Sequence, residues 1–473
     1  IDKKREKFKH KKWILSSQLV SEPSGSITSI VNPYKSSDIV GKVKNSTVLD
    51  VNKSIENANL WTITNEEKSI ILNKIADLYE ENFSEFFAIL CREAGKTISD
   101  SISEIREAVD FIRYYSFEAN KLTNSKPRGK IVCISPWNFP FIMAIWKIGP
   151  ALAAGNTVVI KPAPQTPSST IKLIELAKQI FAPGTIEVIL GDAEVAQQLV
   201  KDPRISMVSI TGSSDSGRKV MQAASETTKR VHLELGGKAP VIVREDADLS
   251  QVAQAISLAC TYNSGQDCTA ATRIYAHHSV VKDLEKLMKQ KMESIKVGDP
   301  KDKSSDIGPL ISEKHRYLVH QKVQKAINDG ATLITGGKVI DGIGFYYTPT
   351  LLSDVKQDNS IIQTEVFGPV ITITSVKDDE EAIKLANDSE YGLASSIWTK
   401  DVGKALEISK KIQAGVTWIN DHLPIISEGP HGGVKGSGFG KDMSQESVLE
   451  YTTTHHIMIK HGQHEVKEGF RPV

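Results

Sequence analysis

The stretch KIVCISPWNFP, residues 130–140, decides the fold of this chain. Within it, Ile131–Ile134 is an uninterrupted apolar run, which is typical of a strand buried on both faces of a parallel sheet. Two prolines and an asparagine follow, and these residues favour a turn. The next apolar run, Phe139–Gly155, is short for a membrane span and contains Lys147, so it predicts a buried helix.

Strands and helices alternate around this stretch. Apolar runs recur at 131–134, 157–160, 186–190 and 207–210, with helical stretches near 141–154, 167–182, 193–201 and 214–226. The alternation predicts a parallel α/β sheet of dinucleotide-binding type, whose ligands lie at the carboxyl ends of the strands.

Flanking segments extend this pattern. Before it, we predict short strands at 13–15 and 39–43, one helix through Ile71, Ile75, Leu78, Asn82 and Phe86, and a second over Ile102–Lys121. After Gly236–Gly237, a second α/β unit is predicted, with helices at 249–260, 280–295 and 312–329, strands at 273–275, 370–376 and 415–419, and a closing β-like stretch at 450–460.

Composition excludes several classes of function. The 473 residues have a net charge of +1, so the chain has no basic field for nucleic acid. Its four cysteines show no CxxC spacing, which argues against a disulfide framework and against structural zinc, and we expect no bound metal. The basic segment Ile1–Lys12 lacks the apolar core of a signal peptide. These features predict a cytoplasmic protein with reduced thiols and no membrane partner.

Cys268 is the candidate nucleophile among the four thiols. It lies in the polar loop NSGQDCT, residues 263–269, and a helix beginning at Thr269 would lower the pKa of this thiol. The alternative is an inert surface thiol. The other three cysteines lie in apolar or amphipathic segments and are predicted to be packing residues: Cys91, Cys133 and Cys260.

Two further residues have the chemistry that a nucleophile needs. Glu234 ends an apolar run before two glycines, where partial desolvation would make its carboxylate a general base. Asn138 follows the strand at 131–134, and its amide could donate to an oxyanion. The alternatives are a solvent-facing glutamate on an edge strand and an asparagine that only makes the turn.

The loop TGSSDSG, residues 211–217, follows one predicted strand and opens a helix. Backbone amides at such a helix start can hold a pyrophosphate. Alone this pattern is common, because Gly/Ser-rich loops follow many strands.

Taken together, the motifs resemble the aldehyde dehydrogenase superfamily from Asn32 to about His461. They are Pro136–Pro140, Lys161–Ala163, Gly212–Gly217, Glu234–Lys238, Gly265–Cys268, Glu365–Pro369, Gly432–Gly433 and Ser437–Gly438. The resemblance implies an α/β fold with a Rossmann-type NAD(P)-binding domain over 13–234, to which 421–448 returns. It further implies a catalytic α/β domain over 235–420 and a small β oligomerisation element at 121–130 and 449–461.

The resemblance also implies roles for individual residues. Cys268 resembles the nucleophile, Glu234 the base for deacylation, and Asn138 part of the oxyanion hole. The implied cofactor-binding residues are Ser135, Pro136, Trp137, Lys161, Gly212, Ser213, Gly217, Glu365 and Phe367.

The implied substrate is a small aliphatic aldehyde. Residues 88–165 are similar to glutamate-semialdehyde dehydrogenases, whereas the part from Glu234 onward, including PHGG at 430–433, is similar to aminobutyraldehyde dehydrogenases. Weighting the second part favours an amino-bearing aldehyde such as 4-aminobutanal, with succinate or glutamate semialdehyde as the alternative. Asp267 could attract the amino group or merely bond its own loop. Trp146 and Trp418 could line the pocket or pack in the core.

Three departures from the family pattern affect the details. Pro164 stands where NAD-preferring relatives have a glutamate, so both NAD and NADP remain candidates. The segment Lys121–Lys130 is shorter than usual, so we expect a homodimer, with a tetramer as the alternative. The loop at 191–195 has fewer glycines than usual, which can change how adenine sits. A Cys-dependent esterase or hydrolase and a binding protein that kept the fold are the competing functions.

Overall fold

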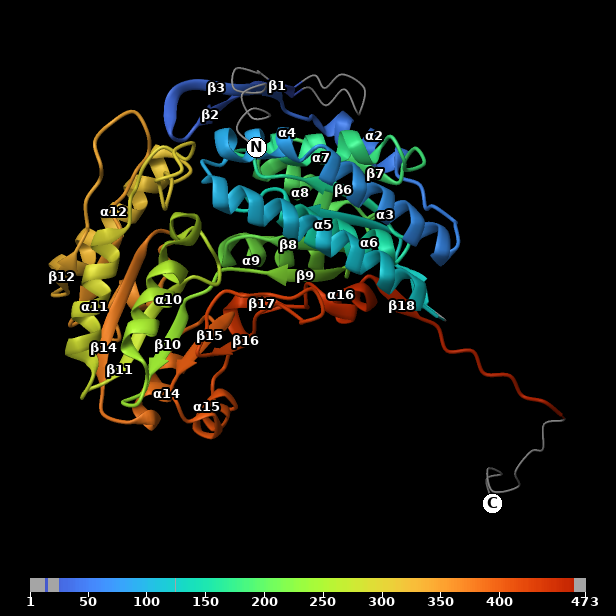
Figure 1. Ribbon diagram of the computed structural model, residues 1–473. Coiled ribbons are helices and arrows are strands. Elements are labelled where there is room, and N and C mark those ends of the chain that lie inside the picture. The colour runs from blue at the N-terminus through green and yellow to red at the C-terminus, as the bar shows by residue number, and fades with distance from the viewer. Residues whose placement is uncertain (1–12, 16–24, 124, 463–473) are drawn as a thin grey trace.

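The computed structural model describes residues 13–15, 25–123 and 125–462, so the basic segment Ile1–Lys12 lies outside the described residues. Figure 1 shows two lobes side by side, with the C-terminal segment running beneath the strands of the first lobe. Within the described ranges, no helix combines the length and the apolar character needed to cross a bilayer.

The first lobe is built on a six-stranded sheet with the order β17-β9-β8-β5-β6-β7. All neighbours are parallel except β17, which runs antiparallel to β9. The strands are β5 Lys130–Ile134, β6 Thr157–Lys161, β7 Ile186–Val188, β8 Met207–Thr211, β9 Arg230–Glu234 and β17 Gly438–Phe439. The predicted parallel α/β sheet is therefore confirmed.

Helices cover both faces of this sheet. Alternate residues of β5 pack into different cores: Ile131 and Cys133 join one apolar cluster, and Val132 joins another on the opposite face. The helices of this lobe are α2 Val48–Asn57, α3 Asn65–Glu81, α4 Phe83–Glu93, α5 Ile98–Lys121, α6 Ile142–Ala153, α7 Pro167–Ala177, α8 Ala193–Lys201 and α9 Ser214–Ser225. The predicted buried helix is α6, whose residues are all buried.

The single helix predicted through Asn82 is wrong. Asn82 ends α3 and begins α4, and its Nδ2 donates a 2.8 Å hydrogen bond to the carbonyl of Leu78. Asparagine competes in this way with the backbone hydrogen bonds of a helix, so the chain turns there.

The second lobe is built on a seven-stranded sheet with the order β12-β13-β14-β11-β10-β15-β16. Only β12 is antiparallel to its neighbour. Its strands are β10 Ala239–Val243, β11 Ala271–His277, β12 Thr332–Thr335, β13 Thr350–Ser353, β14 Val370–Val376, β15 Ala394–Trp398 and β16 Val416–Ile419. Its helices are α10 Leu249–Thr261, η1 Tyr262–Gly265, α11 Val281–Ser294, α12 Glu313–Asn328, α13 Ser360–Gln363, α14 Asp379–Asn387 and α15 Val402–Ser409.

Smaller elements complete the chain. A three-stranded sheet contains β1 Trp13–Leu15, β2 Ile27–Asn32 and β3 Lys35–Lys44, and a two-stranded sheet pairs β4 Ser125–Pro127 with β18 Thr452–Thr454. The predicted β-like stretch at 450–460 is strand only over 452–454. Strand β18 comes after η2 Lys435–Ser437 and α16 Ser444–Glu450 in the chain.

The C-terminal segment returns to the first sheet through β17, where Gly438 pairs with Glu234. A buried ion pair reinforces this return, because Lys147 Nζ on α6 lies 2.6 Å from Asp442 Oδ2. Through these contacts β17 and Asp442 pack against the first lobe.

Candidate active site

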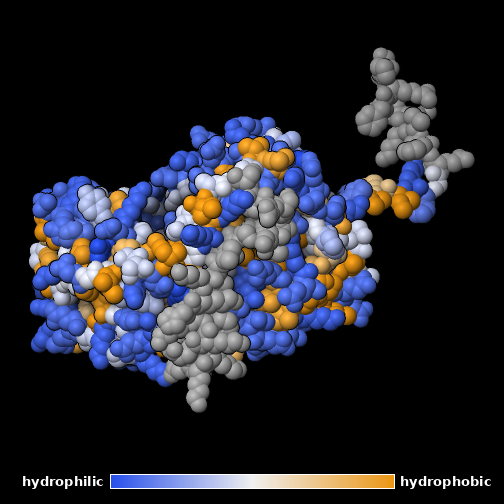
Figure 2. Space-filling view, turned by 90° about the horizontal axis from the view of Figure 1, so that it is seen from above, coloured by the Kyte–Doolittle hydropathy of each residue, from blue (hydrophilic) through white to orange (hydrophobic). Residues whose placement is uncertain are grey.

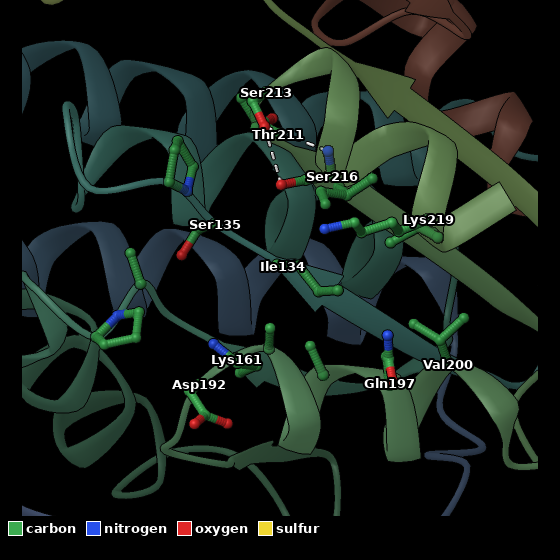
Figure 3. Close-up of a pocket in the computed structure, with 18 of the residues that line it drawn as sticks. Ile134, Ser135, Lys161, Asp192, Gln197, Val200, Thr211, Ser213, Ser216 and Lys219 are labelled. Atoms are coloured by element: carbon green, nitrogen blue, oxygen red, sulfur yellow. Dashed lines mark hydrogen bonds between the residues drawn. The ribbon is translucent and has the colours of Figure 1, made fainter. Parts of the chain in front are cut away.

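A cavity of about 350 Å³ opens at the carboxyl ends of β5, β6 and β8. Six predicted cofactor residues line it: Ser135, Pro136, Trp137, Lys161, Gly212 and Ser213. Figure 3 shows Lys161 and Asp192 on one side of the cavity and Ser213 with Ser216 on the other. The position matches the ligand site of a parallel α/β sheet.

The start of α9 forms one wall of this cavity. Ser213 caps the helix, and its side chain accepts a hydrogen bond of 3.2 Å from the Ser216 amide. Gly212 donates its own N–H to the Glu234 carbonyl at 3.0 Å, so this amide is engaged with the next strand. Gly217 does not line the cavity. A Cβ at Gly217 would lie 2.5 Å from Leu235, so this glycine allows α9 to pack against the end of β9.

Lys161 supplies a buried cation. Burial lowers the pKa of Lys161 to about 8, partly opposed by the charge of Asp192. Its Nζ donates a 3.0 Å hydrogen bond to the Pro162 carbonyl. Four polar lining residues were not assigned to the site from the sequence: Gln165, Asp192, Gln197 and Lys219. Their position near or on helices that flank the predicted ligand edge was the available signal.

The loop before β11 presents Cys268. Asn263 and Ser264 have positive φ angles of 50° and 60°, and the chain turns sharply there. The helix predicted at Thr269 is absent, since residues 269–270 lead directly into β11. The expected lowering of the thiol pKa is therefore wrong. Burial raises the pKa of Cys268 well above its usual value, and the charges of Glu234, Asp267 and Glu365 raise it further.

Glu234 stands at the carboxyl end of β9, with a residue exposure of 1%. Neither of its carboxylate oxygens has a hydrogen-bond partner among the described residues. His431 lies beside it, with Nε2 3.3 Å from Glu234 Oε1. The motif at 430–433 contained this histidine, but its position in the sequence showed no contact with Glu234.

Asn138 lies against the Cys268 loop. The side-chain Nδ2 of Asn138 donates a 3.1 Å hydrogen bond to the main-chain carbonyl of Gln266. The main-chain carbonyl of Asn138 accepts a 2.9 Å hydrogen bond from Asn263 Nδ2. Lys96 Nζ in turn donates to Asn263 Oδ1 at 3.1 Å. An amide group has two N–H donors, so Asn138 has a second N–H that its bond to Gln266 does not use.

Glu365 and Phe367, the two other predicted cofactor residues, do not line the first cavity. Glu365 Oε1 accepts a 2.9 Å hydrogen bond from the Gly237 amide, and burial raises the pKa of Glu365 to about 7. Phe367 has φ 59°, and its ring meets Trp137 edge-on with centroids 5.2 Å apart. His315 Nε2 lies 2.6 Å from the Phe367 carbonyl oxygen and helps to fix this loop.

Two glycines allow the loops of the site to touch. A Cβ at Gly237 would lie 2.3 Å from the Cys268 carbonyl oxygen, and one at Gly265 would lie 2.2 Å from the backbone of Gly368. Gly265 also has φ 72°, which an L-residue rarely adopts. Only glycine therefore fits at either close approach.

A second cavity, of about 430 Å³, contains Cys268 in its wall. Its other lining residues are Ser103, Glu107, Phe139, Ile142, Met143, Trp146, Leu258, Tyr262, Asp267, Thr269, Asp421, His422, Leu423, Pro424, Ile425 and His431. Three are carboxylates, and none is lysine or arginine. The cavity is therefore apolar along much of its wall but favours positive charge.

Of the three predicted pocket residues, Trp146 and Asp267 line the second cavity and Trp418 does not. Trp146 lines the second cavity, whereas Trp418 does not and instead donates from its indole nitrogen to the Pro424 carbonyl at 2.8 Å. Asp267 lines the cavity and also bonds its own loop, because Oδ1 accepts from the Thr269 amide at 2.7 Å. The predicted bond of Asp267 to its own loop is therefore present.

Comparisons with known proteins identify the family. A family model described as "Aldehyde dehydrogenase family" matches residues 20–457. The chain is 36% identical to a phenylacetaldehyde dehydrogenase of Pseudomonas fluorescens over 478 residues, covering 94% of this chain and 95% of that protein. It is 33% identical to a betaine aldehyde dehydrogenase of Bacillus subtilis over 470 residues, covering 94% and 96%.

Solved structures similar to this chain are also aldehyde dehydrogenases. A betaine aldehyde dehydrogenase of Staphylococcus aureus in complex with NAD+ matches with a TM-score of 0.90 and 31% identity, covering 95% of this chain and 93% of that one. An NAD-dependent aldehyde dehydrogenase of Sinorhizobium meliloti matches with a TM-score of 0.92 and 32% identity, covering 96% of each chain. These relatives lend no support to the two-part resemblance to glutamate-semialdehyde and aminobutyraldehyde dehydrogenases. The chain belongs to the aldehyde dehydrogenase family and is an oxidoreductase that acts on aldehydes.

Proposed function

We propose that this enzyme oxidises a small aliphatic aldehyde with a cationic amino group, such as 4-aminobutanal, to its carboxylic acid with NAD or NADP. The observation that carries the proposal is the charge of the second cavity. Glu107, Asp267 and Asp421 line it without any lysine or arginine. A cationic tail is attracted there, whereas the carboxylate of a semialdehyde is repelled.

The first cavity fits a dinucleotide. It lies at the strand ends beside the start of α9, and it contains the cations of Lys161 and Lys219. Ser135, Trp137 and Ser213 would lie along the cofactor, and Phe367, whose ring contacts Trp137, would help to hold it together with Glu365. When bound, the nicotinamide accepts the hydride from the substrate carbon. Pro164 and Lys219 offer a 2′-phosphate no repulsion, so we propose that both cofactors are accepted.

Cys268 acts first in the proposed mechanism. Its thiolate adds to the aldehyde carbon, and the resulting oxyanion is held by the free N–H of Asn138 together with the Cys268 amide. Once the carbon is oxidised to a thioester, Glu234 takes a proton from water, the water oxygen adds to the carbonyl carbon, and the C–S bond breaks. The two unpartnered oxygens of Glu234 suit this role because neither is held by another donor.

A substrate panel tests the proposal. We expect kcat/KM to be higher for 4-aminobutanal than for butanal, succinate semialdehyde or phenylacetaldehyde, each assayed with NAD and with NADP at 340 nm. Betaine aldehyde, also cationic, tests the size of the pocket. Equal values for 4-aminobutanal and butanal would contradict a cationic substrate. Ester hydrolysis without any aldehyde oxidation would favour the hydrolase instead.

Replacement of Glu107 by glutamine should weaken binding of the amino group. A half-buried ion pair of about 1–2 kcal/mol corresponds to a KM increase of roughly 5- to 30-fold for 4-aminobutanal. Butanal should be unaffected, and Asp110→Asn, an exposed carboxylate one turn along α5, is the matched control.

The pH dependence of KM for 4-aminobutanal is a second test of the role of Glu107. Burial and the charges of Glu104 and Asp267 raise the pKa of Glu107 to about 7. Glu107 is ionised above this pH, so KM for 4-aminobutanal should rise as pH falls below about 7. The same change of pH should leave KM for butanal nearly constant, and an equal rise for both aldehydes would exclude Glu107 as the cation-binding group.

We further propose a cytoplasmic homodimer. All four cysteines are free thiols, as expected in a reducing compartment. Figure 2 shows the C-terminal segment standing away from the body, with apolar side chains along it. Ile457, Met458 and Ile459 are 70%, 82% and 71% exposed, which supports their burial against a second copy.

A further inference from the structure

Three metal-binding side chains converge at the proposed nucleophile. One ligand atom each from Glu234, Cys268 and His431 lies within 4.8 Å of the other two. They come from the end of β9, from the loop before β11 and from the segment between β16 and β17. Among the described residues, no other three histidine, cysteine or acidic side chains are grouped so closely.

The polar side-chain atoms of Glu234 and His431 form no hydrogen bonds within the described residues. Both carboxylate oxygens of Glu234 and both ring nitrogens of His431 are buried and have no hydrogen-bond partner among the described residues. Buried polar atoms normally have a partner, so each one without a partner needs an explanation. A bound cation would supply the missing partner for several of them at once.

The surrounding charge also favours a cation. Asp267 and Glu107 line the same cavity, and Glu365 acts on the Cys268 thiol from the other side. The nearby Lys147 is engaged with Asp442 at 2.6 Å, so its charge is neutralised within that pair. The field at the three donors is therefore negative.

We propose that Glu234, Cys268 and His431 form a reversible, inhibitory Zn²⁺ site. Sulfur, imidazole nitrogen and carboxylate oxygen are the ligands of zinc, whereas Mg²⁺ and Ca²⁺ take oxygen ligands. Three protein ligands leave a fourth position for water or for a group of the substrate. Tetrahedral zinc with bonds of about 2.0–2.3 Å needs donors roughly 3.5 Å apart, which side-chain rotation can reach from the present spacing. The absence of CxxC spacing does not bear on this site, because its ligands are far apart in the sequence.

Binding exchanges a proton for the metal. The S–H bond of Cys268 breaks, an S–Zn bond forms, and the proton goes to solvent, with no change of oxidation state. Zinc would then block the thiolate and the carboxylate together and occupy the floor of the aldehyde cavity. Inhibition should therefore be reversed by a chelator and competitive with the aldehyde. This inhibitory consequence rests on the proposed function, whereas the binding itself does not.

The test measures zinc binding without turnover. Chelator-treated enzyme is titrated with buffered Zn²⁺ by calorimetry, in a background in which the exposed tail histidines are replaced: His455→Asn, His456→Asn and His461→Asn. We expect one zinc ion per chain. His431→Phe keeps an aromatic ring against Trp146 and should weaken zinc binding at least 30-fold, whereas His278→Phe, an exposed histidine elsewhere, should not change it.

A second readout uses Co²⁺ in place of zinc. Cobalt bound by the thiolate of Cys268 should show a sulfur-to-metal charge-transfer band, which Cys268→Ala should remove. Unchanged zinc affinity in His431→Phe, or no stoichiometric zinc binding in the parent, would overturn the site. A parent enzyme that oxidises aldehydes but binds no zinc would refute only this inference, whereas a parent enzyme that binds zinc through His431 but oxidises no aldehyde would refute only the proposed function.

Discussion

Replacement of Cys268 by alanine is expected to lower aldehyde oxidation at least about 10⁴-fold, since loss of a nucleophile removes the covalent route altogether. Cys268 is the only one of the four thiols that lines the aldehyde cavity. The measurement is the steady-state rate of cofactor reduction at saturating aldehyde. Mass spectrometry of quenched enzyme should show an acyl adduct on the parent and none on the variant.

Cys260→Ala provides the matched control. This thiol is buried in the core of the second lobe, away from both cavities. Its loss should cost on the order of 1 kcal/mol of stability and leave kcat unchanged. Full turnover by Cys268→Ala would remove Cys268 from the role of nucleophile.

Replacement of Glu234 by glutamine should slow the steady-state rate by about 10²- to 10⁴-fold, the usual contribution of a general base. The first turnover should survive as a burst of about one reduced cofactor per active site, because deacylation alone needs the base. Stopped-flow absorbance at 340 nm separates the two phases.

The rate of the burst in Glu234→Gln should not fall below that of the parent. Glu234 is the largest charge that raises the pKa of Cys268, so a neutral glutamine should lower this pKa toward the ordinary thiol value. More thiolate is then present at neutral pH, and the burst should be at least as fast as in the parent. A variant that loses burst and turnover together would show that Glu234 is needed before the thioester forms.

The fold could be predicted where burial leaves a clear pattern. Parallel strands covered on both faces, such as β5 and β6, are continuous apolar runs. Strands β10 and β15 contain Pro240 and two adjacent serines, residues that weaken a strand pattern, and they were not predicted. The break at Asn82 was missed because the apolar spacing continues across it.

The sequence predicted individual residues of the site but not the contacts between them. Motifs pointed to Cys268, Glu234 and Asn138, and the structure brings them to neighbouring loops. The sign of the shift in the Cys268 pKa was wrong because burial raises it and three carboxylates from separate segments raise it further, which no local pattern reveals. His431 was missed for the same reason, since the pairing of β17 with β9 determines its place beside Glu234.

The return of the C-terminal segment has a consequence for synthesis of the enzyme. A ribosome completes Cys268 and Glu234 well before it makes β17, which pairs with the end of β9, and Asp442, which pairs with Lys147 on α6. Nascent chains should therefore remain inactive until β17 and Asp442 have emerged from the ribosome. Any cleavage before Gly438 would leave the edge of β9 unpaired and expose it to aggregation. Active enzyme is thus expected only from chains whose translation has passed Asp442.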